Sequence, residues 1–184
     1  MTNEYQFGDI IFIRVDNFLY RRVAESSGSW TSHVGILYEH SEAGWVVAES
    51  RVPRCGYCPI DKFIARSRNG EYSVKRLNRS LTENECEAMK VAIHERMGLF
   101  YHLGFNYDSK RQFCSKFVYE VYKEGTGLEI GHLETFKELL SNKPDYPLWF
   151  WKLWYFGRIP WARRTVSPGS QYTSKLLETV SEKR

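Results

Sequence analysis

The stretch Phe113-Cys114-Ser115-Lys116-Phe117-Val118-Tyr119 places a cysteine at the start of an amphipathic segment. Apolar side chains recur at helical spacing beyond it, so we predict a helix over residues 113–123, with the polar run 106–112 as the loop before it. The partial positive charge of a helix N-terminus favours the thiolate that a nucleophilic cysteine needs. Cys114 is therefore a candidate nucleophile, and a buried, unreactive helix cysteine is the alternative.

Two earlier runs, 32–38 and 45–50, are rich in strand-forming residues and flank the short polar stretch 40–44, which predicts a β-hairpin. Alternation along the first strand places His33 and Gly35 on one face of the sheet. The glycine has no side chain, so it leaves room for another group beside the imidazole. An imidazole in such a place can accept the proton of a thiol, and a purely structural histidine is the alternative.

Glu49 stands near the end of the second strand, after a run of apolar residues. If the hairpin turns near Ser41, its carboxylate lies opposite or nearly opposite His33, on the same face of the sheet. A carboxylate there can orient the imidazole ring and stabilise its charged form. Cys114, His33 and Glu49 then form a predicted catalytic triad. The alternative for Glu49 is an ordinary surface position.

Shorter patterns predict the remaining elements. Thr82 and Glu85 fit a capping box, and Gly98 is a natural stop for the helix that starts there. The other expected elements are strands over 10–15 and 72–77 and helices over 60–66 and 133–140. This mixture predicts an α+β fold, in which an antiparallel sheet or small barrel packs against helices.

The composition limits the classes of protein that the chain can be. Of its 184 residues, 42% are hydrophobic and 26% charged, which suits one folded domain and excludes a disordered or membrane-spanning chain. The net charge of +4 is too mild to predict a nucleic-acid partner. Residues 1–8 lack the basic and apolar regions of a signal peptide, so we predict a cytoplasmic location, where thiols stay mostly reduced.

Three motifs occur in a characteristic order: Gly8-Asp9-Ile10-Ile11-Phe12, then Ser32-His33-Val34-Gly35-Ile36, then the stretch that contains Cys114. Together they resemble the permuted NlpC/P60-type papain-like proteins of the YiiX/YaeF/YebB group, over about residues 5–168. The resemblance implies a circularly permuted papain-like fold, in which the histidine strands precede the cysteine helix. We accordingly assign residues 1–168 to one permuted papain-like domain and residues 169–184 to a polar C-terminal tail.

The resemblance also implies roles for single residues. Cys114 matches the nucleophile, His33 the base and Glu49 the third polar residue, while Tyr107 resembles the tyrosine that lines the oxyanion site. The implied activity is that of a cysteine amidase or peptidase, which cleaves an amide bond of a small peptide or N-acyl amino acid through a thioester, without cofactor or metal. Two alternatives stay open: a non-catalytic binding protein on the same fold, and a lipid-linked acyltransferase at a membrane surface.

Two further features of the sequence have no role in the predicted triad. Cys55-Gly56-Tyr57-Cys58 has the spacing of redox and zinc sites, but no second pair of ligands follows, so an incidental loop is expected. In the aromatic run 149–156, three tryptophans are candidates for peripheral membrane contact, because tryptophan suits the headgroup region of a bilayer. A wall for an acyl chain and ordinary core packing are the alternatives. The three tryptophans are Trp149, Trp151 and Trp154.

Overall fold

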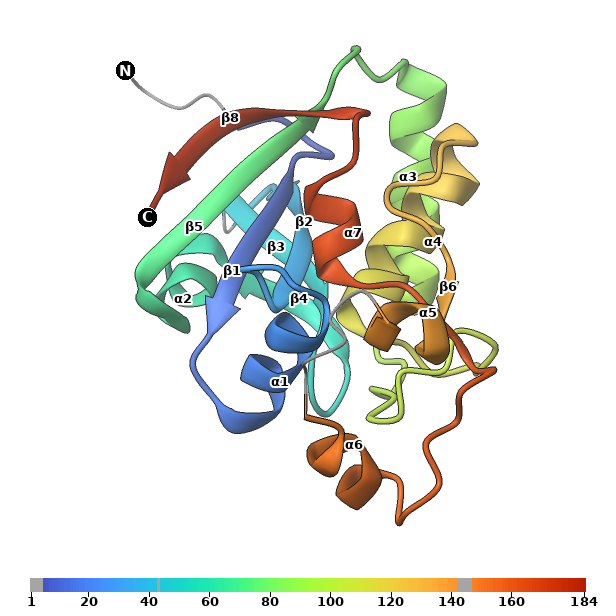
Figure 1. The fold of residues 1–184 in the computed structure, drawn as a ribbon. Coiled ribbons are helices and arrows are strands. Elements are labelled where there is room, and N and C mark those ends of the chain that lie inside the picture. Colours follow the sequence, from blue (N-terminus) through green and yellow to red (C-terminus); the bar gives the residue numbers. More distant parts are fainter. Residues whose placement is uncertain (1–4, 43, 142–146) are drawn as a thin grey trace.

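An antiparallel sheet of six strands forms the centre of the molecule within residues 5–42, 44–141 and 147–184, which the computed structural model describes (Figure 1). The strand order is β4-β3-β2-β1-β5-β8, with β4 and β8 as two separate edges, so the sheet is open and not closed into a barrel. In chain order the elements are β1 (Ile10–Val15), α1 (Phe18–Ser26), β2 (His33–His40), β3 (Gly44–Ser50), β4 (Cys55–Pro59), α2 (Ile60–Ala65), β5 (Ser67–Leu77), α3 (Glu83–Arg96), α4 (Cys114–Thr126), β6 (Glu134–Thr135), α5 (Phe136–Ser141), α6 (Trp149–Trp154), β7 (Arg164–Thr165), α7 (Pro168–Tyr172) and β8 (Leu177–Lys183).

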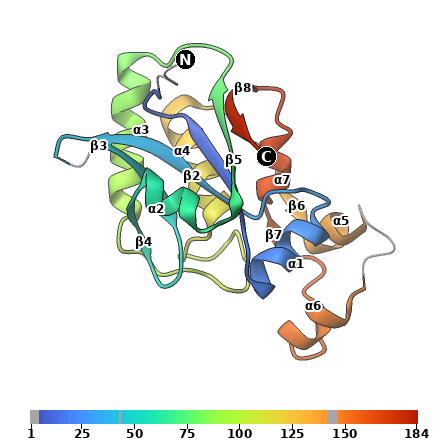
Figure 2. The same ribbon diagram turned by 90° about the vertical axis from the view of Figure 1, so that its left-hand side faces the viewer.

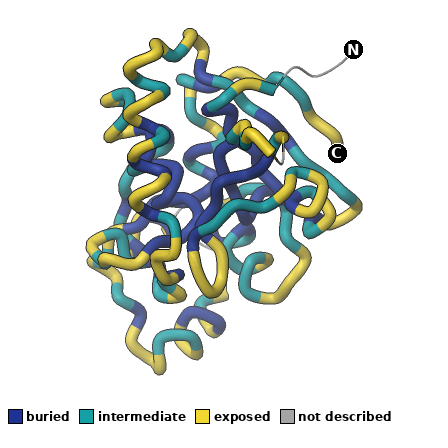
Figure 3. Tube along the Cα trace, turned by 180° about the vertical axis from the view of Figure 1, so that it is seen from behind, coloured by how far each residue is buried: buried dark blue, intermediate teal, exposed yellow. Residues whose placement is uncertain are grey.

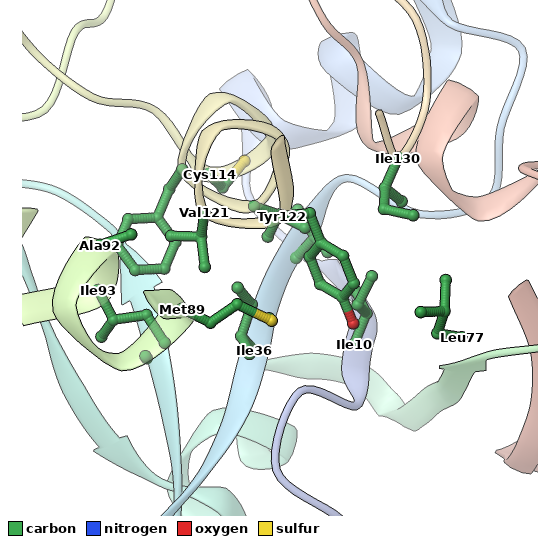
Figure 4. Close-up of a cluster of buried hydrophobic side chains, with 14 of the residues drawn as sticks. Ile10, Ile36, Leu77, Met89, Ala92, Ile93, Cys114, Val121, Tyr122 and Ile130 are labelled. Atoms are coloured by element: carbon green, nitrogen blue, oxygen red, sulfur yellow. The ribbon is translucent and has the colours of Figure 1, made fainter. Parts of the chain in front are cut away.

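The alternation of side chains along β1 divides the core into two layers. Ile10 and Phe12 belong to the layer between the sheet and helices α3 and α4, which Figure 4 shows in close-up. Ile11 and Ile13 belong to the layer on the opposite face, together with Phe63 of α2. Buried residues therefore follow the strands and the inner sides of the helices, while exposed residues follow the loops and outer surfaces (Figure 3).

The two long helices begin where the sequence predicts. The Thr82 hydroxyl accepts the Glu85 N–H at 3.2 Å and the Glu85 carboxylate accepts the Thr82 N–H at 2.8 Å, which confirms the capping box at the start of α3. α4 runs from Cys114 to Thr126, beyond its predicted end, and stops at Gly127, whose φ of 73° suits a residue without Cβ. The helix predicted over 133–140 starts later, as α5, because the short strand β6 takes its first residues.

Residues 169–184, predicted as a polar tail, take a different form. They complete α7 and then form β8, which pairs with β5 from Leu177↔Leu77 to Lys183↔Tyr72 along one edge of the sheet. Of the residues in β8 only Leu177 is buried, so the strand is almost entirely polar and its composition resembles that of a tail. An edge strand needs few apolar residues, because its backbone hydrogen bonds fix it to the neighbouring strand.

Candidate active site

The starts of β2 and α4 meet at the lower end of the sheet in Figure 1. His33 is the first residue of β2, Cys114 is the first residue of α4, and α4 packs against β2 and β3. Glu49 lies near the end of β3, which runs antiparallel to β2 and therefore reaches the same place. His33, Cys114 and Glu49 are 1%, 3% and 0% exposed, so the structure brings the three side chains together in buried surroundings.

The register of the hairpin sets the distance between the imidazole and the carboxylate. Ile36 pairs with Ala48, so the next step along the ladder puts Gly35 beside Glu49, and His33 becomes the diagonal neighbour of Glu49 on the same face. A Cβ at Gly35 would lie 2.4 Å from Val47 Cγ1, which shows how closely β3 approaches there. Glycine at this position lets the Glu49 side chain reach the imidazole.

His33 Nε2 and Glu49 Oε2 are 2.6 Å apart. An ionised carboxylate only accepts hydrogen bonds, so Nε2–H is the donor. Arg66, just after α2, donates from Nη2 to both Glu49 oxygens at 2.8 Å, and Arg51 Nε lies 3.4 Å from Oε1. Burial alone would raise the pKa of Glu49, but the hydrogen bonds and charges of His33 and Arg66 lower it. Glu49 is therefore a buried but charged carboxylate.

The imidazole of His33 is held in its charged form by its neighbours on both sides. Burial lowers the pKa of His33, but its interactions with Cys114 and Glu49 outweigh burial and raise it to about 9. Since Glu49 takes Nε2, Nδ1 is the ring nitrogen left for the thiol; it is buried and makes no hydrogen bond with any described residue. The ring stacks on Phe63 at a centroid distance of 5.5 Å and meets the edge of Tyr20 at 5.4 Å, so its orientation is fixed.

A narrow pocket opens beside the Cys114 side chain, and most of its lining is apolar. Its walls come from α1, from the loop before α4, from α5 and α6 and from residues 165–168. The apolar side chains include Val23, Phe136, Leu139, Trp151 and Val166. The structure therefore offers a thiol, an imidazole and a carboxylate in a row, with room for an apolar group next to the thiol.

Tyr107 does not line this pocket in the described structure. Its ring packs edge-on against Tyr119, 5.7 Å between centroids, and another tyrosine lines the pocket. That residue is Tyr101, which lines the pocket together with Cys114 and Tyr20. Burial raises the pKa of Tyr101, and so does the charge of Cys114, which means that its hydroxyl keeps its proton and can donate it in a hydrogen bond.

No local signal in the sequence marks Tyr101, because its position depends on the fold of the loop that follows it. A parallel bridge joins Tyr101 to Gln112, and His102 N–H donates to the Gln112 carbonyl at 2.6 Å. The buried Lys116 ammonium closes the loop by donating to the carbonyls of Ser109 and Arg111. The loop therefore returns to the start of α4 and brings a residue from before the loop beside the thiol.

The tryptophans of the aromatic run point in different directions. Trp151 is buried and lines the pocket, so its predicted role in membrane contact is wrong, and the alternative of a hydrophobic wall describes it better. Trp154 is half-buried and donates its Nε1–H to the Leu103 carbonyl at 3.0 Å. Trp149 is exposed. Across the described ranges, no helix has both the length and the apolar character needed to cross a bilayer.

Cys55 and Cys58 do not form a joint site. They lie on β4, which pairs with β3 where a loop is predicted, and their spacing of three puts them on opposite faces of this strand. Cys55 accordingly belongs to the core layer of α3 and α4, and Cys58 packs against the layer of α2. Among the residues with described positions, no three His, Cys, Asp or Glu side chains group as metal ligands.

With the fold and the site in place, comparisons with known proteins decide the family. A family model described as "Permuted papain-like amidase enzyme, YaeF/YiiX, C92 family" matches residues 4–181. The chain belongs to this family. The predicted family and the predicted permuted papain-like fold are thereby confirmed, and the matched range includes most of β8.

A curated relative and a solved structure agree with this family. The uncharacterized protein YiiX of Escherichia coli strain K12 is 26% identical over 184 residues, which cover 96% of this chain and 86% of YiiX. A crystal structure of YiiX from Escherichia coli O157:H7, described as a metalloprotein, superposes with a TM-score of 0.85 at 27% identity, over 97% of each chain. Membership of the permuted papain-like amidase family supports a cysteine hydrolase in general.

Proposed function

We propose that this protein is a cysteine amidase that cleaves the amide bond of an N-acyl amino acid or small peptide, with Cys114, His33 and Glu49 as its triad. The observation that carries the proposal is the buried row from the Cys114 thiol through the His33 imidazole to the Glu49 carboxylate, which stands next to a pocket. A purely structural histidine does not need a carboxylate on one nitrogen and a free, buried nitrogen on the side of a thiol. The same row argues against a protein that only binds its ligand.

The chemistry follows from the protonation states. His33, whose pKa is raised to about 9, accepts the proton of the Cys114 thiol. The thiolate attacks the amide carbon and forms the C–S bond, and the electron pair of the C=O bond moves to its oxygen. His33 then gives its Nδ1 proton to the leaving nitrogen, the C–N bond breaks, and a thioester remains. Water, with its proton taken by His33, attacks the thioester and releases the acid and the thiolate.

Negative charge develops on the carbonyl oxygen during each attack, and hydrogen-bond donors directed at this oxygen stabilise it. The N–H of Cys114 has no acceptor within its own helix, because it belongs to the first residue of α4. The Tyr101 side chain lines the same pocket as Cys114, and its raised pKa keeps the hydroxyl protonated. We assign these two groups to the oxyanion site, in place of Tyr107.

The lining of the pocket favours the acyl side of the substrate. Seven apolar side chains line the space next to Cys114, with Phe105 and Pro168 among them, while Arg66 binds Glu49 outside this lining. An apolar acyl group would therefore fill the pocket, and the amino-acid or amine part would leave through the open side. The cytoplasmic location predicted from the sequence would favour acylated metabolites and recycled fragments over intact cell wall.

Alkylation of the wild-type protein by iodoacetamide at neutral pH tests the triad, with mass spectrometry to find the modified cysteine. Cys58 and Cys86 are both more exposed than Cys114, so accessibility alone predicts that they react first. The triad predicts that Cys114 reacts first, and that His33→Ala removes this preference while Cys58 and Cys86 react as before. Equal or faster alkylation of Cys114 in His33→Ala would refute the role given to His33.

Hydrolysis of a series of N-acyl amino-acid anilides with acyl chains of increasing length tests the substrate class. Turnover should be absent in Cys114→Ala and should improve as the acyl chain grows to fill the pocket. If Cys114 is alkylated selectively but the protein hydrolyses none of these anilides, the cysteine is activated as proposed, and the proposed amide substrate is wrong.

A further inference from the structure

The helix α6 and the turn after it project from the lower end of the molecule, beside α1 (Figures 1 and 2). Large apolar side chains on this projection and at the start of α1 are exposed to solvent. We call the four of them the aromatic surface: Phe18, Trp149, Leu153 and Phe156, which are 54%, 50%, 71% and 96% exposed. Phe18 of α1 contacts Trp149 of α6 at a centroid distance of 6.4 Å, so the surface is continuous across two elements. Exposed apolar patches of this kind mark contact sites.

The backbone at the tip of the projection indicates that this exposure is built into the fold. Phe156 has a φ of 51°, in the left-handed region that costs a bulky residue energy, and Gly157 follows with a φ of 87°. A strained conformation persists only where the surrounding structure enforces it. Here Tyr155 donates its hydroxyl to the Gly104 carbonyl at 2.9 Å and Trp154 is tied to Leu103, so both residues before the tip are anchored.

Positive charge surrounds the aromatic surface. The sequence from Pro147 to Thr165 contains no Asp or Glu but includes Lys152, Arg158, Arg163 and Arg164. Arg164 is paired with Asp108, whereas Lys152 and Arg158 are exposed and make no ion pair with any residue of the described ranges. On the α1 side, the Arg22 guanidinium lies 5.1 Å from the centre of the Phe18 ring and 5.0 Å from that of Trp149, and it is paired with Glu25 at 2.9 Å, so the free positive charge comes from Lys152 and Arg158.

From this combination we propose that the aromatic surface docks on an anionic phospholipid membrane. Aromatic rings that enter the headgroup region together with flanking Lys and Arg are the features of interfacial binding, and unpaired cations complement anionic lipid rather than zwitterionic lipid. A protein partner of the same apolar character would need matching acidic groups to neutralise Lys152 and Arg158. A membrane of anionic lipid supplies that charge everywhere along its surface.

The same two elements that carry the aromatic surface also build the site. On the inner side of α6, Trp151 lines the pocket at Cys114, and α1 contributes Tyr20 and Val23 to its walls. Docking through the outer sides of these helices would therefore bring the pocket to the lipid interface, where acyl chains are concentrated. This consequence for the substrate rests on the proposed amidase function, whereas the docking itself does not.

Sedimentation with vesicles tests the docking, using vesicles of mixed phosphatidylglycerol and phosphatidylcholine against vesicles of phosphatidylcholine alone. We expect the wild-type protein to bind the anionic vesicles, less tightly as salt is added. The double variant Leu153→Ser, Phe156→Ser should bind about tenfold or more weakly, because two apolar side chains no longer enter the interface. The double variant Lys152→Glu, Arg158→Glu should lose at least about tenfold on anionic vesicles.

Matched controls distinguish binding through the aromatic surface from non-specific binding by other exposed apolar or cationic residues. A further control shows whether binding depends on the catalytic residue. Val91→Ser removes a comparably exposed apolar residue from α3, and Lys175→Glu reverses an exposed cation before β8, so both should bind like the wild type. Cys114→Ala should also bind like the wild type, which keeps the result independent of the amidase proposal. The docking is overturned if the wild type ignores anionic vesicles, if Leu153→Ser, Phe156→Ser binds as tightly as Val91→Ser, or if the surface residues instead drive self-association in sedimentation equilibrium.

Discussion

Charged side chains are usually exposed and apolar side chains usually buried, and two regions at the same end of the molecule depart from this pattern in opposite ways. Around His33 the fold buries charged groups, and each of them has a partner: Arg66 and His33 both donate to Glu49. Along α6 the fold exposes apolar groups, and Phe156 is held almost entirely in solvent. Buried charge is costly unless paired, and exposed apolar surface is costly unless it is used, so both exceptions indicate function. The first indicates chemistry within the protein and the second indicates contact outside it.

The largest expected difference between the two regions is in turnover. Replacing His33 by alanine removes both the proton acceptor and the proton donor, so hydrolysis of an N-acyl amino-acid anilide should fall by roughly 10²–10⁴-fold. Replacing Leu153 by serine should leave the hydrolysis of a short, water-soluble anilide unchanged, because that side chain points away from the pocket. Steady-state kinetics of the two variants, with folding checked by circular dichroism, gives the comparison. Similar losses in both would remove the distinction between the regions.

The next largest difference concerns the free energy of unfolding. Glu49→Ala leaves Arg66 and the His33 ring without their shared partner, and breaking a buried charge pair costs about 3–5 kcal/mol. Phe156→Ser removes a side chain with few contacts, so its effect should stay within about 0.5 kcal/mol. Urea denaturation measures both values. A loss at Phe156 as large as that at Glu49 would mean that the exposed ring is part of the packing.

A smaller effect on turnover distinguishes two tyrosines. Tyr101→Phe removes one proposed donor to the developing oxyanion, so kcat should fall by roughly 10²–10³-fold with little change in KM. Tyr107→Phe is the matched control and should leave kcat near that of the wild type, because Tyr107 packs against Tyr119 outside the pocket. If Tyr107→Phe is the variant that loses activity, the assignment of the oxyanion site is reversed.

The smallest effect tests how closely β3 approaches the imidazole. Gly35→Ala places a Cβ 2.4 Å from Val47 Cγ1 and 3.0 Å from the Ala48 carbonyl oxygen, so it should cost about 1–3 kcal/mol of stability. Gly56→Ala on the neighbouring strand β4 adds a Cβ that meets no described atom within 4 Å and should have little effect. Urea denaturation of the two variants compares them directly. Equal stability of Gly35→Ala and Gly56→Ala would show that the β2–β3 hairpin can shift to make room for a Cβ at Gly35.

The sequence predicts one of the two regions much better than the other. The closeness of His33 and Glu49 could be predicted because a hairpin has a fixed period and a short turn, so the alternation of β2 and β3 places both on one face. The helix that begins at Cys114 could be predicted equally well, from the helical spacing of the apolar residues that follow. Within the aromatic run, nearly every position is apolar, so periodicity does not reveal that Trp151 faces inward while Trp149 faces solvent. Only packing against α1 and α5 decides between them.

Other parts of the site depend on contacts that no local pattern records. Arg66 reaches Glu49 from the end of α2, and Tyr101 returns to Cys114 through the bridge between Tyr101 and Gln112. Both are surrounded by ordinary loop or helix residues in the sequence. The sequence does not predict the strand β8, for a different reason. Leu177 is its one buried residue, so no alternation of buried and exposed side chains marks the strand, which is formed by pairing with β5.

The imidazole of His33 allows the central claim to be tested at the level of a single proton. Its pKa is raised in the folded protein to about 9 from a usual value near 6.5. The stabilisation that its charge contributes is therefore complete below about pH 6.5 and is lost as the pH rises through about 9. Hydrolysis should decline over the same alkaline range, because the leaving nitrogen then has no proton donor.

An NMR titration of the ¹⁵N-labelled His33 ring, assigned by comparison with His33→Ala, measures this proton directly. We expect a midpoint near pH 9 in the wild-type protein, and a clearly lower midpoint in Cys114→Ala and in Glu49→Gln, where one of the two supporting groups is lost. A midpoint near 6.5 in the wild type, unchanged in both variants, would show that the imidazole is not paired with the thiol and the carboxylate, and would contradict the proposed triad.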